Sequence, residues 1–586
     1  MKRTHTCGQL RLSDSGHEVV LSGWVRRRRD HGGVIFIDLC DREGITQVVF
    51  NPEASPAAHR DAQALRSEFV VTVPGKVRPR PEGTANPKLP TGEIEILARE
   101  IEVLNPSRTP PFAIEDAEEL QEDVRLQYRY LDLRRPKMLT NLKLRHEVTR
   151  KIREMLNGKG FWEIETPLLT KSTPEGARDY LVPSRVHPGK FYALPQSPQL
   201  FKQMLMVAGV DRYFQIARCL RDEDLRSDRQ PEFTQVDLEM SFVDEGDVMG
   251  VIDDLVARVF EDVLNVRLPL PIARMPYPEA MLRYGADKPD TRFGLLIHDL
   301  GEVFSASPFS VFKQMRETGG TIRGFSVPKG AALSLKQLEE LIAFSQQAGA
   351  GGLVWILFKE DGLFKSPIQR LLTQTEIAGL QQTLGAGPGD CVFIVADRAD
   401  VAADVLGRLR LKVARDLNLV PKGVFNLLWV VEFPLLQFNQ EEGRFEAVHH
   451  PFTSPMAEDL LLLESDPGKA RARAYDLVLN GVELGGGSIR IHREEMQEKI
   501  FALLKISPEQ ARERFGFLLD ALRHGAPPHG GIALGLDRML MLMLGLDSIR
   551  DVIAFPKTQR AICLTTDSPA KVSERQVKEL HIKISE

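Results

Sequence analysis

Residues 212–243 read RYFQIARCLRDEDLRSDRQPEFTQVDLEMSFV, the most informative stretch of the chain for both fold and chemistry. Two strand-like runs flank a polar loop from Asp224 to Pro231, which predicts an antiparallel hairpin with a long connection. Side chains alternate across a strand, so Arg221 and Glu223 share one face. On the second run, one face carries the side chains of Phe233, Gln235, Asp237 and Glu239.

The opposite face of the second run is apolar, with Val236, Leu238 and Met240. The hairpin therefore has one apolar side and one side with a cation, carboxylates, an amide and an aromatic ring. A purine and its phosphates need such a surface, because rings stack on the base and charged groups form strong hydrogen bonds with phosphate. We interpret this face as a nucleotide-binding surface; an exposed hairpin of chance composition is the alternative.

A glycine-rich segment, NGVELGGGSIRIHR at 480–493, holds Glu483 and Arg490 seven residues apart. A regular strand would point these two side chains to opposite faces. The three glycines at 485–487 could supply a bulge that corrects the mismatch, or could allow a ligand to approach closely. A purely structural glycine turn is the alternative.

Two further segments place polar side chains on otherwise apolar elements. Near the C-terminus, GGIALGLDRMLML puts Arg538 where a buried cation would need an anionic partner, and phosphate is the natural one. In QSPQLFKQMLM at 196–206, a helix capped by Ser197 would present Gln199 and Lys202 on the same face. A glutamine and a lysine on a helix are more often simply solvated, so this second signal is weak alone.

The first hundred residues predict a small β-barrel of the OB type. Its strand-like segments are VVLSGWV, VIFIDLCD, ITQVVF, FVVTVPGKV and GEIEILAREIEVL. A helix-like stretch at 52–68 follows the third segment, and this order is that of an OB barrel, whose second and third strands commonly face an oligonucleotide. A barrel with a purely structural role is the alternative. Four arginines at 26–29 mark either a solvated strand end or a binding patch.

Composition bounds the class of protein. Hydrophobic residues make up 43% and charged residues 27% of 586 residues, which excludes a disordered chain, and the net charge of −5 excludes a generally basic nucleic-acid binder. The five cysteines lack CxxC spacing, which argues against a disulfide framework and a structural zinc site. No apolar run is long enough for a membrane span and no secretory leader is evident, so we predict a cytoplasmic protein without membrane partners.

Changes in composition and in the predicted secondary structure along the chain predict five segments. An OB barrel would occupy 1–105 and a proline-rich, acidic hinge 106–140; a larger domain would be split into 141–291 and 416–586 by an inserted domain at 292–415.

The chain resembles a known family through a series of motifs in the correct order. KGFWEIETPLL (159–169), CLRDE with FTQVDLE (219–239) and GIALGLDR (531–538) match the three motifs of class II aminoacyl-tRNA synthetases. STPEGARDYLVP, LPQSPQLFKQ, RDEDLRSDRQPEFTQ, HHPFT, ELGGGSIRIH and DVIAFPKT are together similar to bacterial-type aspartyl-tRNA synthetases. The resemblance covers essentially the whole chain.

This resemblance implies the fold class, an α+β multidomain protein with an N-terminal OB-fold β-barrel, an antiparallel-sheet class II catalytic domain and an inserted α/β domain. It implies a homodimer, with the Pro167 segment at the interface. The implied reaction is an ATP-dependent ligation in two steps. The aspartate α-carboxylate attacks the α-phosphate of ATP and releases pyrophosphate, and the terminal adenosine of tRNA then takes the aspartyl group.

For ATP, the resemblance implies that Arg221 holds the α-phosphate, Glu223 accepts from the adenine amino group and Phe233 stacks on adenine. The implied ATP-binding set is Arg221, Asp222, Glu223, Gln230, Phe233, Glu483, Gly535, Leu536, Asp537 and Arg538. The implied catalytic residues are Arg221, Glu483 and Arg538. Asp476 and Glu483 resemble carboxylates that hold Mg²⁺, which prefers oxygen ligands and phosphate bridging, and no zinc is expected.

For L-aspartate, Arg490 and Lys202 resemble a pair that grips the side-chain carboxylate. Asparagine could not neutralise two such buried cations, and a site built this way rejects a lookalike by about 10⁴-fold or more. The full implied set is Glu175, Gln199, Lys202, Arg221, Gln235, Asp237, His449 and Arg490.

For tRNA, Phe36 and Gln47 resemble residues that stack on and read the middle anticodon base, with Arg78 and Glu93 near the flanking bases. Two loop positions suggest that tRNA-Asn is charged as well as tRNA-Asp. Relatives restricted to tRNA-Asp commonly have leucine after RRRD and a larger residue in the loop after the fourth strand, whereas this chain has His31 and Gly83.

Three alternatives to this reading stay open. Neutral loop drift in an enzyme strictly specific for tRNA-Asp would also leave a histidine and a glycine at those two loop positions. A lysine- or asparagine-specific relative would share the barrel and the three motifs. A synthetase-like RNA-binding protein that has lost catalysis would share the fold.

Overall fold

The computed structural model describes residues 2–115, 120–173 and 177–585. The chain divides into two compact units, which are described separately. The first comprises Met1–Lys143 with Ala554–Thr558 and Ile562–Pro569, and the second comprises the remainder. The predicted hinge therefore groups with the barrel, and the predicted inserted domain groups with the catalytic domain. The five predicted boundaries themselves stay predictions.

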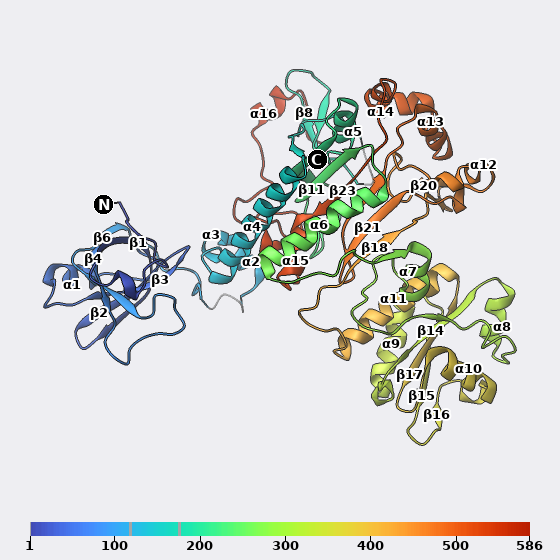
Figure 1. Ribbon diagram of the computed structural model, residues 1–586, viewed down its shortest axis with the longest axis horizontal. Coiled ribbons are helices and arrows are strands. Elements are labelled where there is room, and N and C mark those ends of the chain that lie inside the picture. The colour runs from blue at the N-terminus through green and yellow to red at the C-terminus, as the bar shows by residue number, and fades with distance from the viewer. Residues whose placement is uncertain (1, 116–119, 174–176, 586) are drawn as a thin grey trace. The chain divides into compact units, whose positions relative to one another are not determined.

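The first unit begins with a closed barrel (Figure 1). Its elements are β1 (Glu18–His31), β2 (Val34–Asp41), β3 (Gly44–Phe50), α1 (Pro56–Ala62), β4 (Val70–Pro79), β5 (Ile94–Ala98) and β6 (Glu102–Asn105). The strand order is β1-β2-β3-β5-β4-β6, and β1 also pairs with β4, which closes the barrel. The single strand predicted at 92–104 is two strands, because the chain turns after Ala98 and the N–H groups of Arg99 and Glu100 bind the carbonyl of Pro74.

Strand β1 contains a bulge at Arg26. Val25 pairs with Leu39 and Arg27 with Asp38, so Arg26 has no opposite residue on β2. Before the bulge the inward side chains are buried aliphatic residues such as Val19, Leu21 and Val25. The extra residue shifts the alternation of side chains and re-aims the four arginines of the run.

The hinge consists of α2 (Glu122–Gln127) and α3 (Arg129–Asp132), after which α4 (Pro136–Gly158) begins. Asp132 is completely buried and accepts hydrogen bonds from Arg125, Arg129 and Arg135. Three guanidinium groups around one carboxylate satisfy a buried charge that would otherwise be costly. Residues 122–135 of the predicted hinge are therefore held by ion pairs rather than forming a loose linker.

The second unit is built on an antiparallel sheet with parallel edge strands. Its strands are β7 (Trp162–Glu163), β10 (Arg212–Leu220), β11 (Glu232–Ser241), β12 (Arg274–Pro276), β18 (Leu427–Val431), β21 (Ala474–Leu479), β22 (Val482–Ile489) and β23 (His529–Gly535). The order is β12-β18-β21-β22-β23-β11-β10-β7. β10 and β11 form the predicted hairpin, with residues 221–231 as its connection.

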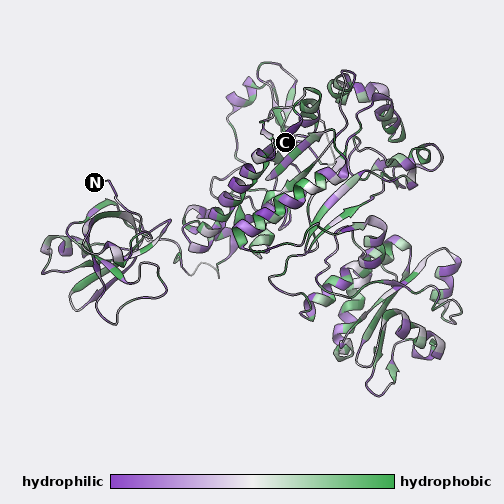
Figure 2. Cartoon of the chain, in the orientation of Figure 1, coloured by the Kyte–Doolittle hydropathy of each residue, from purple (hydrophilic) through white to green (hydrophobic). Residues whose placement is uncertain are grey.

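Helices cover the apolar face of this sheet. Side chains of α4, α6 (Glu245–Leu264) and α15 (Leu536–Met543) share one buried core with the strands, and Val236 and Leu238 of β11 point into it. Figure 2 shows the apolar residues concentrated along the central strands and the helix faces against them. The alternation therefore turns the charged side chains of β11 toward the other face.

The inserted domain has its own sheet with helices on both faces. Its strands are β13 (His298–Asp299), β14 (Thr321–Val327), β15 (Val354–Phe358), β16 (Phe364–Lys365) and β17 (Cys391–Asp397). α9 (Leu335–Gln347) and α11 (Ala399–Asp416) pack on one face, and α8 (Ser310–Glu317) and α10 (Gln374–Leu384) on the other. Two separate apolar cores result, as expected of an α/β domain.

Smaller elements complete the second unit. They are α5 (Gln199–Val207), α7 (Tyr277–Tyr284), α12 (Leu462–Ser465), α13 (Glu494–Leu503), α14 (Pro508–Leu522), α16 (Glu574–Glu579) and the hairpins β8–β9 (Leu181–Pro183, Phe191–Ala193) and β19–β20 (Leu436–Asn439, Arg444–Ala447). Within the described ranges, no helix is both long enough and apolar enough to cross a membrane. The five cysteines are buried free thiols.

Candidate active site

A cavity of about 470 Å³ lies against the polar face of the catalytic sheet. Among the residues of the β10–β11 hairpin that line it are Arg221, Glu223, Phe233, Gln235 and Asp237. Their side chains share one side because Cys219 pairs with Phe233 and Ala217 with Gln235, so that the alternation of both strands is in step. The shared wall predicted from the sequence is therefore confirmed.

Arg221 and Glu223 follow the end of β10 and already have partners inside the cavity. The guanidinium carbon of Arg221 lies 5.1 Å from the centroid of the Phe233 ring. Arg229 Nη1 lies 2.9 Å from Glu223 Oε2. Arginine side chains thus contact Phe233 and Glu223, the two groups that are expected to bind the adenine ring and its amino group. Nucleotide binding would replace these two arginine contacts by contacts with adenine.

The opposite wall of the cavity carries a bulge at Leu484. Val478 of β21 pairs with Glu483, whereas Leu477 pairs with Gly485, so Leu484 is the extra residue. Because of this shift, Glu483 and Arg490 both line the cavity, which confirms the bulge predicted from the glycine run. The glycines also provide space: a Cβ atom at Gly486 would lie 2.5 Å from Asp476 Oδ1.

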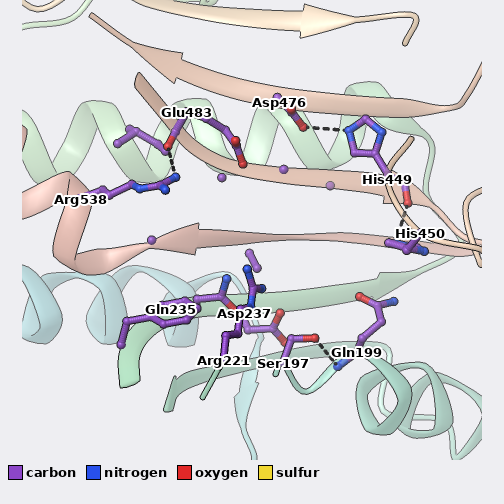
Figure 3. Close-up of a pocket in the computed structure, with 18 of the residues that line it drawn as sticks. Ser197, Gln199, Arg221, Gln235, Asp237, His449, His450, Asp476, Glu483 and Arg538 are labelled. Carbon is purple, nitrogen blue, oxygen red and sulfur yellow. Dashed lines mark hydrogen bonds and ion pairs between the residues drawn. The ribbon is translucent and has the colours of Figure 1, made fainter. Parts of the chain in front are cut away.

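Asp476 and Glu483 form a carboxylate pair beside His449 (Figure 3). His449 Nε2 lies 3.2 Å from Asp476 Oδ1. Burial raises the pKa of Glu483, and the neighbouring Asp476 charge raises it further. Burial favours neutral His449, but Asp476 outweighs this and raises the pKa of the imidazole. The two carboxylates therefore lie close enough to affect each other, and a divalent cation bound between them would favour the charged form of both.

A buried network of four charges forms the floor of the cavity. Lys202 Nζ, on α5, lies 2.7 Å from Asp237 Oδ1 and 3.2 Å from Glu239 Oε2. Arg490 Nε and Nη2 donate to the two carboxylate oxygens of Glu239 at 2.8 and 3.1 Å. A Cβ atom at residue 531 would lie 2.1 Å from Glu239 Oε2, so only Gly531 leaves room for this carboxylate.

The sequence predicts that Lys202 and Arg490 bind the side-chain carboxylate of aspartate as two buried cations, and the structure shows that both side chains are buried. Each already has a carboxylate partner, and Arg490 Nη1 also donates to Ser488 Oγ at 2.6 Å and to His450 Nε2 at 2.8 Å. Among the described residues, these bonds engage four of the five guanidinium N–H groups, which leaves one for a ligand. The cations are thus positioned by their partners rather than left bare.

The pKa values of the two carboxylates of the network are shifted in opposite directions. Burial would raise the pKa of Glu239, but Arg490 and Lys202 overcome it and hold the pKa at about 2. Burial raises the pKa of Asp237, and Lys202 offsets this only in part. A second cation next to Asp237, such as the ammonium group of an amino acid, would favour its charged form.

Several buried polar atoms in the cavity have no hydrogen-bond partner among the described residues. They are Gln199 Nε2, Asp237 Oδ2 and His449 Nδ1. Buried polar groups are almost always satisfied, so orphans that point into one cavity indicate a polar ligand. Gln199 begins α5, and its N–H binds the Ser197 hydroxyl at 3.3 Å, so Ser197 stabilises this helix start although Pro198 occupies the cap position.

Arg538 lies at the start of α15 on the cavity rim. Its Nη1 donates to the Glu483 carbonyl at 3.1 Å, and its Nη2 lies 3.3 Å from Asp228 Oδ2. The side chain is 25% exposed, so it is not the fully buried cation that its apolar surroundings suggested. Gly535 and Gln230 also line the cavity.

Three predicted ATP-site residues have other surroundings, and one predicted aspartate-binding residue lies outside the described residues. Leu536 belongs to the apolar core and Asp222 faces away, 3.8 Å from Arg178. Asp537 lines the cavity, but its carboxylate binds Arg145 and the N–H of Thr234. Glu175 falls within 174–176, outside the described residues.

The sequence assigns no role to the residues that support the network. Its alternation does place Glu239 on the same face of β11 as Asp237, and the structure confirms this placement. His450 is the second histidine of HHPFT, and its pKa is held well below the usual range by burial and by Arg490, so its Nε2 is a neutral acceptor. Asp228 has no sequence signal, because its role depends on how the loop 221–231 folds back.

The barrel carries a separate polar surface. Phe36 is half-buried on the outer face of β2, opposite Arg29. Next to it, Gln47 Nε2 donates to Glu95 Oε2 at 2.8 Å, and Arg78 Nε donates to Glu95 Oε1 at 2.8 Å. Glu95, rather than the exposed Glu93, therefore lies between Gln47 and Arg78.

The two loop positions His31 and Gly83 are both exposed. His31 ends β1 before a turn through two glycines of positive φ. Gly83 has φ +77°, and a Cβ atom there would meet nothing within 4 Å. Neither loop is filled by packing, so both positions are open to a ligand.

The fold and the cavity together define a class of enzyme. Residues 121–559 match the family of class II tRNA synthetases (D, K and N), and residues 19–104 match the OB-fold nucleic acid binding domain. The chain belongs to the class II tRNA synthetases.

Full-length relatives narrow the comparison. The Aspartate--tRNA(Asp/Asn) ligase of Moorella thermoacetica is 57% identical over 583 residues, covering 100% of this chain and 97% of the relative. That of Desulfatibacillum aliphaticivorans is 56% identical over 584 residues, covering 100% and 98%. The asparaginyl-tRNA synthetase of Pyrococcus horikoshii, complexed with asparaginyl-adenylate, has the same fold, with a TM-score of 0.60 at 19% identity over 95% of this chain and 99% of that one.

Proposed function

We propose that this chain is an ATP-dependent aspartate–tRNA ligase. It activates L-aspartate with ATP to aspartyl-adenylate, releases pyrophosphate and transfers aspartate to the 3′ end of tRNA-Asp and of tRNA-Asn. The observation that carries the proposal is the buried network of Lys202, Asp237, Glu239 and Arg490 on the floor of a class II cavity. The full-length relatives named Aspartate--tRNA(Asp/Asn) ligase support it.

Each end of aspartate has a matching group in the cavity. The side-chain carboxylate would take the remaining N–H of Arg490 and approach Lys202, while the ammonium would lie next to Asp237, whose Oδ2 is free of hydrogen bonds among the described residues. The amide of Gln199 and the ring of His449 supply further polar contacts. Asparagine would bring an N–H group toward donors, which leaves buried polar groups unpaired.

ATP would bind along the hairpin wall. Phe233 would stack on adenine, Glu223 would accept from its amino group, and Gln230 would contact the nucleotide. Arg221 would stabilise the charge that develops on the α-phosphate during attack, because a preorganised cation costs no rearrangement at that moment. Arg538 would bind the γ-phosphate after releasing Asp228.

The residues present also fit a magnesium ion. Mg²⁺ usually takes one or two protein carboxylates and completes its shell with phosphate oxygens and water, and Asp476 and Glu483 form such a pair. No cluster of three candidate ligands occurs among the described residues, in keeping with a site that substrate completes. When bound, the ion would neutralise phosphate charge.

A homodimer is part of the proposal. Exposed apolar side chains lie on β7, on the segment after it, which contains Pro167, and on the β8–β9 hairpin. Trp162, Leu168, Leu169, Leu181 and Phe191 are each at least 47% exposed. Grouped exposed apolar residues of this size mark interaction surfaces. We place the enzyme in the cytoplasm, where its proposed substrates ATP and tRNA are used.

Aspartate-dependent exchange of labelled pyrophosphate into ATP tests the activation step. We expect exchange with L-aspartate and at least about 10³-fold lower kcat/KM with L-asparagine or L-lysine. Preference for lysine or asparagine would identify a different member of the family. No exchange with any amino acid, together with retained tRNA binding, would identify an RNA-binding protein without catalysis.

Charging of tRNA-Asn is a separate prediction, motivated by His31 and Gly83 in open loops of the barrel. Neither position presents a group that would clash with the wrong anticodon base, and rejection of a close competitor usually needs one. We expect aspartylation of purified tRNA-Asn with kcat/KM within about 10³-fold of that for tRNA-Asp. A larger gap would mean a strictly tRNA-Asp-specific enzyme.

The double variant His31→Leu, Gly83→Lys sharpens this test. We expect it to weaken charging of tRNA-Asn more than charging of tRNA-Asp. Lysine at residue 83 must adopt the left-handed φ of the glycine, which costs about 1–2 kcal/mol locally. Gly83→Ala, which carries similar strain without the long cation, is the matched control.

A further inference from the structure

The arginine run at 26–29 serves two different neighbourhoods. Beyond the bulge, Arg29 Nη2 donates to Asp38 Oδ1 at 2.6 Å and to Gln47 Oε1 at 3.3 Å, at the barrel surface that is predicted to bind the anticodon. Arg26, at the bulge, instead has its Nη1 3.6 Å from Glu68 Oε1. Its side chain is only 10% exposed, so Arg26 is not available to a phosphate backbone. The run is therefore not one basic patch.

Glu68 is the centre of the second neighbourhood. Its side chain is 2% exposed, and its φ of +65° is a conformation that non-glycine residues rarely adopt. Besides Arg26, it accepts a hydrogen bond from Arg134 Nη1 at 2.8 Å. Arg134 belongs to the hinge, so this carboxylate joins two guanidinium groups from different parts of the first unit. A strained backbone and a buried charge are retained where surrounding contacts fix them.

Arg134 makes two more contacts with the barrel. Its guanidinium carbon lies 4.8 Å from the centroid of the Trp24 ring, and its carbonyl accepts from Arg26 Nη2 at 3.4 Å. A planar guanidinium can stack on a ring and bind a carboxylate at the same time, which an ammonium cannot. The next residue, Arg135, turns the other way and binds Asp132 inside the hinge at 3.0 Å. Of these two adjacent arginines, Arg134 thus contacts the barrel and Arg135 contacts the interior of the hinge.

The contact of Arg134 with the barrel lies on the same barrel face as the surface that is predicted to bind the anticodon. Phe36, Asp38 and Cys40 alternate along the outer face of β2. Cys40 is only 5% exposed, with Arg26 Nη2 3.6 Å from its sulfur, whereas the Phe36 end stays open. The Cys40 end of this face is therefore next to the contact with the hinge, and the Phe36 end is open to nucleotides.

We propose that Arg134, with Glu68, Trp24 and Arg26, forms a joint that fixes the barrel to the hinge, and that Arg134 is a positioning residue for tRNA charging. The inference rests on the proposed function. Arg134 lies two residues before α4, a continuous helix whose later residues Val148 and Ile152 are buried in the catalytic core. The joint is thus followed directly by the helix that continues into the second unit.

A tRNA substrate would bind the barrel by its anticodon and the catalytic cavity by its 3′ end. Binding at one place then raises the effective concentration at the other, but only if the geometry between the two is held. Loosening the joint should therefore impair tRNA charging while leaving both individual sites intact. Adenylate formation needs no tRNA and should not change.

The test uses full-length enzyme with Arg134→Ala and with the conservative variant Arg134→Lys. We expect Arg134→Ala to lower kcat/KM for charging of full-length tRNA-Asp by about tenfold or more. Aspartate-dependent pyrophosphate exchange should stay within twofold, and so should the Kd for an isolated anticodon stem-loop, measured by fluorescence anisotropy. Arg134→Lys should recover part of the charging, because it keeps a cation near Glu68. Arg258→Ala, which removes an exposed arginine of α6, is the matched control.

Amide hydrogen exchange supplies a readout that does not depend on tRNA. In Arg134→Ala, residues 128–135 should exchange faster while β3 of the barrel core keeps its protection. Unchanged charging would overturn the proposal, whether or not the hinge exchanges faster. Equal loss of stem-loop affinity would also overturn it, since Arg134 would then act on the barrel surface itself. Absence of pyrophosphate exchange in the unmodified enzyme would instead refute the proposed function.

Discussion

Replacing Arg490 with leucine is expected to lower kcat/KM for aspartate in pyrophosphate exchange by about 10³-fold or more. The guanidinium is 2% exposed, and its remaining N–H group is the expected partner of the substrate side chain. Leucine removes this donor and the charge while preserving the bulk of the floor. The Kd for ATP, measured by calorimetry, should change little, because the hairpin wall is separate from this contact.

A stability control must accompany this variant. Arg490→Leu leaves Glu239 buried with only Lys202 as a cation partner, and breaking a buried ion pair typically costs about 3–5 kcal/mol. The double variant Arg490→Leu, Glu239→Leu removes both partners and should recover most of the free energy of unfolding in urea without recovering activity. Aspartate-dependent exchange equal to that of the unmodified enzyme would refute the assignment of Arg490.

Replacing Arg221 with alanine is expected to lower kcat for aspartate activation by about 10²–10³-fold, typical of losing one group that stabilises transition-state charge. Arg221 lines the cavity and lies over Phe233. Its Nε donates a hydrogen bond of 3.4 Å to the carbonyl of Gln196, and no hydrogen bond to a carboxylate is described for it. Single-turnover formation of aspartyl-adenylate measures the step directly. Because the ground-state contact is a weak stacking interaction, the folded protein should keep its stability.

Arg218→Ala is the matched control for Arg221. Arg218 lies three residues earlier on β10, but its side chain faces the other side of the sheet, where it contacts Glu232 at 3.4 Å and Thr234. Removing this half-exposed ion pair should change the free energy of unfolding by about 1 kcal/mol at most and leave activation intact. A similar loss of kcat in both variants would show that the effect of Arg221 is structural.

Alternation along strands made much of the site predictable. The hairpin wall from Arg221 to Asp237 follows from period two alone, once the two runs are recognised as paired strands. The bulge was predictable because Glu483 and Arg490 have incompatible parity unless one residue is extra, and three glycines stood between them. The barrel was predictable for the same reason, since each strand has one aliphatic face.

The rest depends on contacts between distant segments. Glu239 shares the predicted face, but nothing in the sequence shows that Gly531 vacates the space for its carboxylate. Leu536 and Asp222 belong to motifs of which only some side chains reach the cavity: Leu536 points into the apolar core and Asp222 lies at the surface. The split of the arginine run required the bulge at Arg26, which leaves no periodic signal in a row of identical residues.

The pair of Glu239 and Arg490 also constrains how the polypeptide matures during synthesis. The two residues are 251 positions apart, and the entire inserted domain is translated between them. Until residue 490 emerges, Lys202 must balance two buried carboxylates, and β11 lacks its neighbour β23. The first catalytic segment therefore cannot complete its interior until these later segments have been synthesised. The inserted domain, which has its own apolar cores, can fold in this interval and leave the halves of the catalytic sheet to join last.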